Sequence, residues 1–465
     1  MEECILIAVP GRTDPIRGEH DGPILHIIRH YHPEKVILIL TEEIGMMEEQ
    51  YHHNETAIHL MDPNCEVVCK YTGIKNAHSY DNFSIPFLSI CDQVCEKNPG
   101  KKILVDITSG TPQMETALCM IAISDSERYI PVQVASPERG ASKSTHFNPE
   151  TDLVEDWFET DIDNDGDENR CNIPNVTNFK RPIIQFQILS LIRNYDYAGA
   201  YQLYELNKDG FSEKTGKLLD HAKNRLNLED AKAVKVARDL KMYDVLYPVK
   251  RDDILKLVDY FNSMQIKQMR GELNDFAMRL EVMTEFLGIY ILEKCMKVKI
   301  DDITYKRSRN VICTNEEKCK GKMPGIDIYL DEQFSDRLSG HYDWGKPLNA
   351  LSIIHFVKFM SQQEAYKKYA SAANEMLKWV ELSGQVRNPA AHTIIAINED
   401  SIRAGYEGKD SAALCRAMRT VMIQVFEKEM KKAALDIYDQ INTIIQDSLM
   451  KTEQAEMHRI AEAEL

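Results

Sequence analysis

Arg387 and His392, which lie five positions apart in the run Arg387-Asn388-Pro389-Ala390-Ala391-His392, could together cut RNA without a metal. A histidine titrates near neutral pH, so it can move the protons of the ribose 2′-hydroxyl and of the 5′-leaving oxygen. A guanidinium stays charged and can stabilise the negative charge that grows on a phosphate. The pattern alone is weak, because an arginine five residues before a histidine arises often by chance in a chain with 14 histidines. A surface arginine and a histidine on a helix face are the structural alternative.

The spacing of the two residues sets a condition on the backbone. Five positions correspond to roughly 140° around an ideal helix, so one continuous helix in one chain does not aim both side chains at one phosphate. Either the helix breaks between them or a second chain supplies the partner residue. Pro389 lacks a backbone donor and disfavours helical geometry at Asn388, which predicts a new helix with Pro389 in its first turn.

The first 160 residues alternate apolar runs of strand length with helical patterns. The apolar runs predict strands buried on both faces at 5–9, 36–40, 65–69, 103–105 and 130–134. The intervening patterns predict helices at 23–31, 42–60, 84–96 and 112–124. This order predicts an α/β Rossmann-like N-terminal domain with a parallel sheet.

The remainder of the chain has an all-α pattern. An acidic stretch from Asp161 to Glu168 precedes it, and Pro174 and Pro182 indicate a boundary in this region. Helical periodicity predicts several short helices over 183–264, a long helix over 268–297, and later helices over 348–382, 388–397 and 411–449. The predicted domains are 1–160, an acidic linker at 161–180, a helical linker domain at 181–266, and a second helical domain at 267–465.

Two patterns that could bind a metal favour a structural interpretation. Asp161, Asp163 and Asp165 have the spacing of half an EF-hand loop, but Asn172 stands where a bidentate glutamate is needed, and Pro174 interrupts the exiting helix. The cysteine pairs are spaced more widely than the tight knuckles of zinc sites, at 65 and 69, 91 and 95, and 313 and 319. We therefore expect no metal.

The composition indicates the class of protein and its surroundings. The chain has 465 residues, of which 43% are apolar and 28% charged, as in a globular protein of several domains. Its formal charge of −17 argues against a broad basic surface that coats nucleic acid, although one positive cleft is still possible. Eleven scattered cysteines, the missing basic flank of a signal peptide and the lack of a membrane-length segment predict a cytoplasmic protein.

Two loops at the carboxyl ends of predicted strands could hold an anion. In the run from Asp106 to Met114, small hydroxyl residues, a glycine and a proline at a helix start let the backbone approach a phosphate. This loop lacks the lysine of a Walker A motif, and the alternative is an ordinary capped turn. The loop from Pro10 to Arg17 brings two arginines and a glycine to the same edge of the sheet.

The order of these motifs resembles the CARF-HEPN accessory ribonucleases of type III-A CRISPR systems, the Csm-type stand-alone nucleases. The resemblance depends on the run from Thr108 to Met114, on the run from Arg387 to His392, and on the first-strand loop Gly11-Arg12-Thr13-Asp14-Pro15 with Asp21-Gly22-Pro23. It covers nearly the whole chain except the acidic insertion and the tail. It implies a CARF ligand-sensing domain at 1–160 and a HEPN ribonuclease domain at 267–465.

The resemblance also implies a ligand and the residues that hold it. The CARF domains of two subunits would bind a cyclic oligoadenylate, and the six-membered ring is the expected activator. Thr111 would assist a slow cleavage of this ring, and Arg387, Asn388 and His392 match the R-N-x-x-x-H pattern and would be catalytic. Carried over by position, the ligand-binding residues would be Gly11, Arg12, Thr13, Asp14, Thr41, Asp81, Asn82, Thr108, Ser109, Gly110, Thr111, Pro112 and Gln113.

The expected function is cleavage of single-stranded RNA by a homodimer, with no cofactor, no metal and no membrane partner. The 2′-oxygen would attack the adjacent phosphate, so DNA, which lacks this nucleophile, should not be cut. Two alternatives stay open: a nucleotide-sensing dimeric scaffold without nuclease activity, and a constitutive HEPN toxin that cuts RNA without a ligand. A metabolic enzyme with a Rossmann domain is disfavoured, because no cofactor fingerprint is present.

Overall fold

The computed structural model describes residues 3–12, 14–137, 148, 151–166, 168–309, 311–335, 341–392 and 396–463, apart from the side chains of 387–392 and 451–463. The chain separates into two compact units, Met1–Ile183 and Ile184–Leu465. The finer division into four segments stays a prediction. None of the described helices is both long and apolar enough to cross a bilayer.

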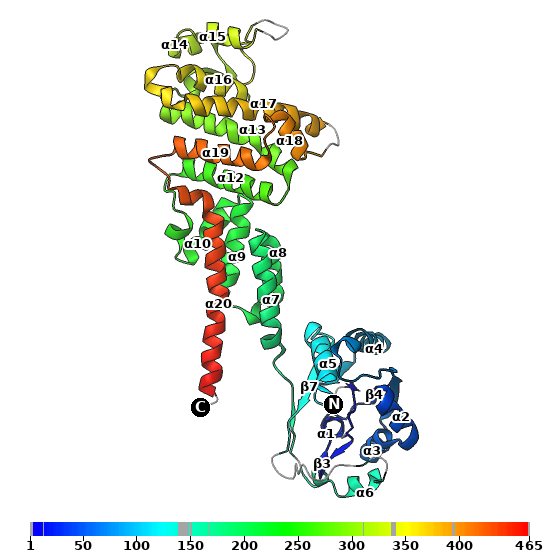
Figure 1. Ribbon diagram of the computed structural model, residues 1–465. Helices are drawn as coiled ribbons and strands as arrows, with labels where there is room; N and C mark the ends of the chain where they lie inside the picture. The colour runs from blue at the N-terminus through cyan, green and yellow to red at the C-terminus, as the bar shows by residue number, and fades with distance from the viewer. Residues whose placement is uncertain are drawn as a thin grey trace. The chain divides into compact units, whose positions relative to one another are not determined.

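The N-terminal unit is built on a six-stranded sheet with the strand order β5-β4-β1-β6-β7-β8. Figure 1 shows most of this unit in blue to cyan, with β4 and β7 labelled. Five strands are parallel: β1 (Cys4–Ala8), β4 (Lys35–Leu40), β5 (Glu66–Tyr71), β6 (Lys102–Asp106) and β7 (Tyr129–Val134). The edge strand β8 (Cys171–Asn172) is antiparallel to β7. The prediction of an α/β Rossmann-like domain is therefore confirmed.

Helices cover both faces of this sheet. One apolar core contains residues of α1 (Pro23–Tyr31), α2 (Glu42–Tyr51) and α3 (His53–Met61), and the other contains residues of α4 (Ser84–Lys97) and α5 (Pro112–Ser124). The unit also contains a hairpin of β2 (Ile16–Arg17) and β3 (His20–Asp21), and α6 (Val154–Glu159). The chain runs from β1 out to β5 and then returns to β6 beside β1. Ligands bind at such a switch point in open α/β sheets.

The single helix predicted over 42–60 is wrong, because the chain breaks at His52, which has a left-handed backbone with φ of 54°. The Glu48 carboxylate accepts the N–H groups of Asn54 over 3.1 Å and Glu55 over 2.9 Å, so it satisfies donors at the start of α3. The third predicted strand is not buried on both faces, because β5 is an edge strand and its residues are partly exposed.

The C-terminal unit is almost wholly helical, as predicted. The long helix expected from 268 starts later, at Leu273, because the chain turns at Gly271 with φ of 73°. The helices are α7 (Val176–Arg193), which contains Pro182 and spans the division between the units, α8 (Tyr197–Leu206), α9 (Glu213–Leu226), α10 (Asp230–Asp239), α11 (Tyr243–Leu246), α12 (Asp252–Met269), α13 (Leu273–Tyr290), α14 (Glu316–Lys322), α15 (Ile326–Gln333), α16 (Ala350–Met360), α17 (Ala370–His392), α18 (Glu399–Gly405), α19 (Ser411–Val425) and α20 (Ile437–Ala463). A hairpin of β9 (Thr304–Ser308) and β10 (Val311–Thr314) interrupts them.

The helix break predicted before Pro389 is wrong, because α17 continues through this residue to His392. A proline inside a helix costs about 3 kcal/mol. Upstream in the same helix, Trp379, Leu382 and Val386 are buried in the main core of the unit. Each large apolar side chain contributes about 1.5–3 kcal/mol when buried, so packing of the whole helix outweighs the local preference of one residue.

Candidate functional site

The loops after β1 and β6 meet at the switch point of the sheet. A Cβ atom on Gly11 would lie 3.4 Å from the backbone nitrogen of Gly110, so the two loops are in contact. Gly110 has φ of 99°, and a Cβ atom there would lie 3.2 Å from the carbonyl oxygen of Val9. A side chain at this position would both strain the backbone and crowd β1. The structure therefore brings together the two loops that the sequence singled out as an anion site.

The segment that carries Asp81 and Asn82 is attached to the same place. The Thr111 hydroxyl donates to the carbonyl oxygen of Ala77 over 2.8 Å. The side-chain amide of Asn82 donates to the carbonyl oxygen of Asn76 over 3.0 Å, which holds this segment in a compact turn. These two bonds place residues 76–82 beside the start of α5.

The predicted residues after β1 and β4 are also near one another. The Arg12 guanidinium pairs with the carboxylate of Glu43, in the first turn of α2. Thr41 directly precedes this helix and is buried. Thr13 lies outside the described residues. The candidate ligand residues thus surround the carboxyl ends of neighbouring strands, and their role in binding stays a prediction.

Sequence reasoning missed Asp106, a fully buried carboxyl group at the end of β6. Burial, and to a smaller extent the nearby Asp14 carboxyl, raise the pKa of Asp106 to about 7, although Ser109 and the N–H of Thr108, which donates over 2.8 Å, lower it. Burial also raises the pKa of Asp14, whereas the Arg17 guanidinium lowers it. Two carboxyl groups with raised pKa values would repel an anionic ligand less than two ionised ones.

We expect Asp106→Asn to stabilise the N-terminal unit at alkaline pH. The pKa of Asp106 is raised in the folded state, so its destabilising effect begins above the unfolded pKa near 4 and grows until about pH 7. At pH 8 the gain should be on the order of 4 kcal/mol, and near pH 4 it should vanish. Hydrogen exchange of the β6 amides across this range measures it. A gain independent of pH would contradict this explanation.

A second buried cluster contains Asp21, His26 and Asp163, whose ligand atoms lie within 4.8 Å of one another. The Nε2 atom of His26 accepts the backbone N–H of Arg170 over 3.0 Å, and its Nδ1 atom is 3.3 Å from Asp21 Oδ2. Arg29 donates two hydrogen bonds to Asp21, over 2.6 and 2.9 Å. Guanidinium groups therefore already supply the positive charge, and the arrangement fits an ion-pair network better than a metal site.

The arginine-histidine motif lies at the carboxyl end of α17, where Arg387, Asn388 and His392 fall in its last two turns. Beyond the motif, the N–H of Ile397 donates to Asn274 Oδ1 over 2.6 Å, which attaches the following segment to the start of α13. The side chains of the motif lie outside the described residues. Because α17 is continuous, the two residues are roughly 140° apart around its axis.

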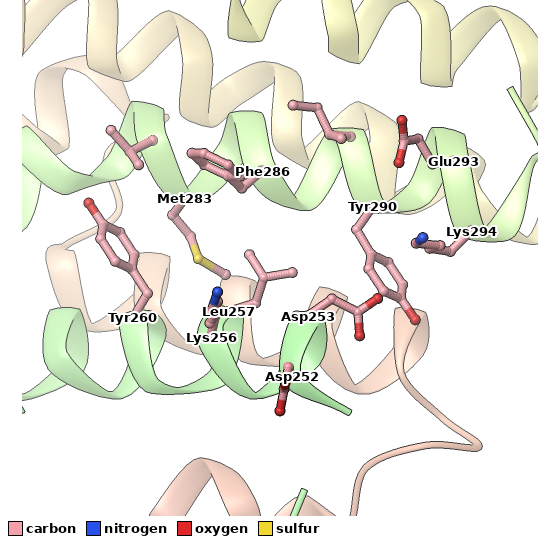
Figure 2. A pocket seen from close by; sticks show the side chains of 12 residues that line it. Asp252, Asp253, Lys256, Leu257, Tyr260, Met283, Phe286, Tyr290, Glu293 and Lys294 are labelled. Carbon is pink, nitrogen blue, oxygen red and sulfur yellow. The ribbon is translucent and has the colours of Figure 1, made fainter. Parts of the chain in front are cut away.

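A pocket of about 570 Å³ lies between α12 and α13 (Figure 2). Tyr260, Phe286 and Tyr290 line it together with aliphatic residues and with charged ones, which are Asp252, Asp253, Lys256, Glu293 and Lys294. Among the side chains that the structure describes, its lining includes none of the predicted site residues.

Comparison with known proteins places these features in a family. Residues 64–171 match the Cas_Csm6 CARF domain, residues 174–226 the Csm6 6H domain, and residues 246–446 the Cas_Csm6 HEPN domain. A curated relative from Enterococcus italicus, named CRISPR system endoribonuclease Csm6, is 25% identical over 96% of this chain and 100% of its own length. A relative of the same name from Mycobacterium tuberculosis is 26% identical over 94% of this chain and 97% of its own length.

The fold comparison agrees with the domain matches. A solved structure of Enterococcus italicus Csm6 bound to cyclic hexa-2′-fluoro-hexa-dAMP has a TM-score of 0.67 and 22% identity, and covers 96% of this chain and 99% of that chain. The N-terminal sheet has a switch point of the kind at which ligands bind, and the helical unit that follows carries the R-N-x-x-x-H motif. Together these features define a CARF-HEPN protein. The chain belongs to the Csm6 family.

Proposed function

We propose that this protein is an endoribonuclease that cuts single-stranded RNA when a cyclic oligoadenylate binds to its CARF domain. The observation that carries the proposal is the R-N-x-x-x-H motif from Arg387 to His392, which lies within the stretch that matches the HEPN domain. The names of two relatives that align over nearly the full chain support the activity. The activity would belong to antiviral defence by a type III CRISPR system.

The proposed reaction needs only the chain's own residues. His392 accepts the proton of the ribose 2′-hydroxyl, and the 2′-oxygen attacks the adjacent phosphorus. The bond from phosphorus to the 5′-oxygen then breaks, and a second imidazole protonates the leaving oxygen. Arg387 stabilises the charge that develops on the phosphate, and Asn388 orients it. The products are a 2′,3′-cyclic phosphate and a 5′-hydroxyl end, and no metal takes part.

The proposed active form is a homodimer. A continuous α17 separates Arg387 from His392 by roughly 140°, so one copy of the helix does not present both residues to the same phosphate. Two copies related by a two-fold axis can each contribute residues to one composite site. The spacing allows either a broken helix or a partner residue from a second chain, and we therefore propose the second chain.

The proposed activator is a cyclic oligoadenylate, with the six-membered ring expected. The contact between the loops of Gly11 and Gly110, the raised pKa values of Asp14 and Asp106, and the position at the switch point support an anionic ligand. The Enterococcus italicus structure, which contains a cyclic hexa-dAMP analogue, supports this ring size.

The decisive experiment incubates the full chain with labelled single-stranded RNA and with rings of three to six adenylates, in the presence of EDTA. We expect cutting that depends on the six-membered ring, persists without free divalent metal, and leaves 2′,3′-cyclic phosphate ends. DNA of the same sequence should stay intact. Binding without cutting would favour the scaffold, and equal cutting without any ring would favour a constitutive toxin.

Thr111→Ala should weaken ligand binding or prolong ligand action without harm to the RNA-cutting site. The variant loses the hydroxyl that donates to Ala77 and that we propose assists slow ring cleavage. We expect a severalfold change in the ring's affinity or lifetime, measured by calorimetry and by chromatography of the ring. Thr111→Ser keeps the hydroxyl and should behave as wild type. An unchanged affinity and lifetime in Thr111→Ala would argue against this placement.

A further inference from the structure

The loop after β1 is attached to the β2–β3 hairpin. Within the loop, the N–H of Gly11 donates to Asp14 Oδ2 over 2.7 Å. The hairpin closes on the loop through Gly22, whose N–H donates to the carbonyl oxygen of Pro15 over 2.9 Å. A Cβ atom on Gly22 would lie 2.4 Å from that oxygen and 2.8 Å from Asp14 Oδ1, so a larger residue does not fit. A shift of the loop must therefore move the hairpin or break these contacts.

The acidic segment around Asp163 is also bound to the hairpin. Asp163 Oδ1 is 2.9 Å from His20 Nδ1, and Asp163 Oδ2 accepts the backbone N–H of Asp21 over 3.0 Å. The N–H of Ile162 donates to the carbonyl oxygen of Glu19 over 2.9 Å. One carboxylate thus contacts both residues of β3, and the neighbouring backbone fixes the turn before it.

Arg170 connects this carboxylate to the last strands of the sheet. Its Nη2 donates to Asp163 Oδ2 over 2.6 Å, and its Nη1 donates to the carbonyl oxygen of Ala135 over 3.1 Å. Its backbone oxygen accepts the N–H of Ala135 over 2.9 Å, and only 5% of its side chain is exposed. Ala135 directly follows β7, and Arg170 directly precedes β8. The planar fork of a guanidinium is required to hold both acceptors at once.

The loop after β6 reaches the same pair of strands. Thr108 Oγ1 accepts the N–H of Val134, the last residue of β7, over 2.9 Å. Val134 pairs with Cys171 of β8, and the chain continues from β8 into α7 and the helical unit. Both loops of the candidate ligand site are therefore linked by hydrogen bonds to the strand through which the chain leaves the sheet.

We propose that Asp163 and Arg170 are positioning residues that transmit ligand binding from the β1 loop to β8, and so regulate the nuclease. This inference rests on the proposed function, because it assigns the regulation of the same site. The path runs from the β1 loop through the β2–β3 hairpin, Asp163 and Arg170 to β8. Each step is a hydrogen bond between buried or partly buried groups. A contiguous path carries coupling only if its loss changes the response to the ligand, which a stability measurement alone does not reveal.

The test uses the full chain with Arg170→Met, Asp163→Asn and the double variant. Arg128→Met is the matched control, because Arg128 forms exposed ion pairs with Asp92 and Asp125 in the same unit. For each protein, calorimetry measures the affinity for cyclic hexaadenylate, and labelled RNA measures cleavage with and without the ring. We expect stimulation by the ring to fall about tenfold in each single variant, with affinity changed by less than about threefold.

The double variant should lose no more stimulation than either single variant, since Asp163 and Arg170 are consecutive steps of the same path. Hydrogen exchange of the β8 amides provides a readout independent of cutting: the ring should alter it in the wild type and not in the variants. Wild-type stimulation in Asp163→Asn and Arg170→Met would overturn the proposal, as would a parallel loss of affinity and stimulation. If Arg170→Met does not fold, the result for Asp163→Asn decides whether the proposal holds, because asparagine has nearly the same shape as aspartate.

Failure of the proposed function is distinguishable from failure of this inference. A wild-type chain that binds the ring and changes exchange at β8, yet cuts no RNA, would contradict the nuclease and leave the path within the N-terminal unit intact. If the wild-type chain cuts RNA only when the ring is present, and the variants respond to the ring equally well, only the proposed path is contradicted.

Discussion

His392→Ala is expected to lower the rate of RNA cutting by about 10²- to 10⁴-fold, the usual cost of removing a general acid or base. Arg387→Ala is expected to have an effect of similar size, because the charge on the phosphate then lacks its stabilising cation. In a composite site, each dimer of the variant loses both copies of the group. Initial rates with labelled RNA at saturating cyclic hexaadenylate measure both effects.

The controls for this result come from the same unit. His341→Ala and Arg403→Ala change exposed residues whose ion pairs, with Asp331 and Asp400, lie outside the motif. Both variants should cut as the wild type does. The Arg387 and His392 variants should also keep the wild-type melting temperature and ring affinity, since both residues lie at the end of α17. Cutting at the wild-type rate by either variant would remove the motif from the active site.

The second large effect is expected from Gly110→Ala, which should reduce ring affinity by at least about tenfold. The backbone of Gly110 has φ of 99°, and a non-glycine residue there costs on the order of 1–2 kcal/mol. The new Cβ atom would also lie 3.1 Å from Met114 Sδ and 3.2 Å from the carbonyl oxygen of Val9. The loop must then shift away from Val9, which alters the proposed ligand site. Calorimetry with cyclic hexaadenylate measures the loss.

Gly73→Ala separates the effect of crowding from that of backbone strain. Gly73 also has a left-handed backbone, with φ of 68°, but no atom lies within 4 Å of its Cβ position. This variant should lose a similar amount of stability and keep its affinity for the ring. If both glycine variants bind the ring equally well, the loop of Gly110 does not form part of the ligand site.

The α/β fold could be predicted from sequence because a parallel strand is buried on both faces. The apolar runs at 5–9 and 36–40 have no alternation of polar residues, and they form β1 and β4 in the centre of the sheet. The helices at 23–31 and 112–124 were also predicted at their observed bounds. Where a side-chain contact interrupts the helical pattern, as between Glu48 and Asn54, the prediction of one continuous helix failed.

The candidate ligand site could be predicted in part. Residues of the two loops were predictable because strand ends of a parallel sheet share one edge, so loops far apart in sequence must approach each other. Asp106 was not predictable as a group with a raised pKa, because this property depends on complete burial and on the nearby carboxyl of Asp14. Neither the burial of Asp106 nor the approach of Asp14 can be read from the sequence of one loop alone.

The sequence by itself determined the order of the domains, the motifs at Thr108 to Met114 and at Arg387 to His392, and the strands of the N-terminal sheet. These features depend on local residue types and on their period. The tertiary structure decided whether α17 passes through Pro389, since the burial of Trp379 and its neighbours outweighs the local preference of a single proline. It also decided that the Asp163 carboxylate accepts the backbone N–H of Asp21, 142 positions away. A hydrogen bond between distant residues leaves no periodic signal in a sequence, because its geometry arises only when the chain has folded.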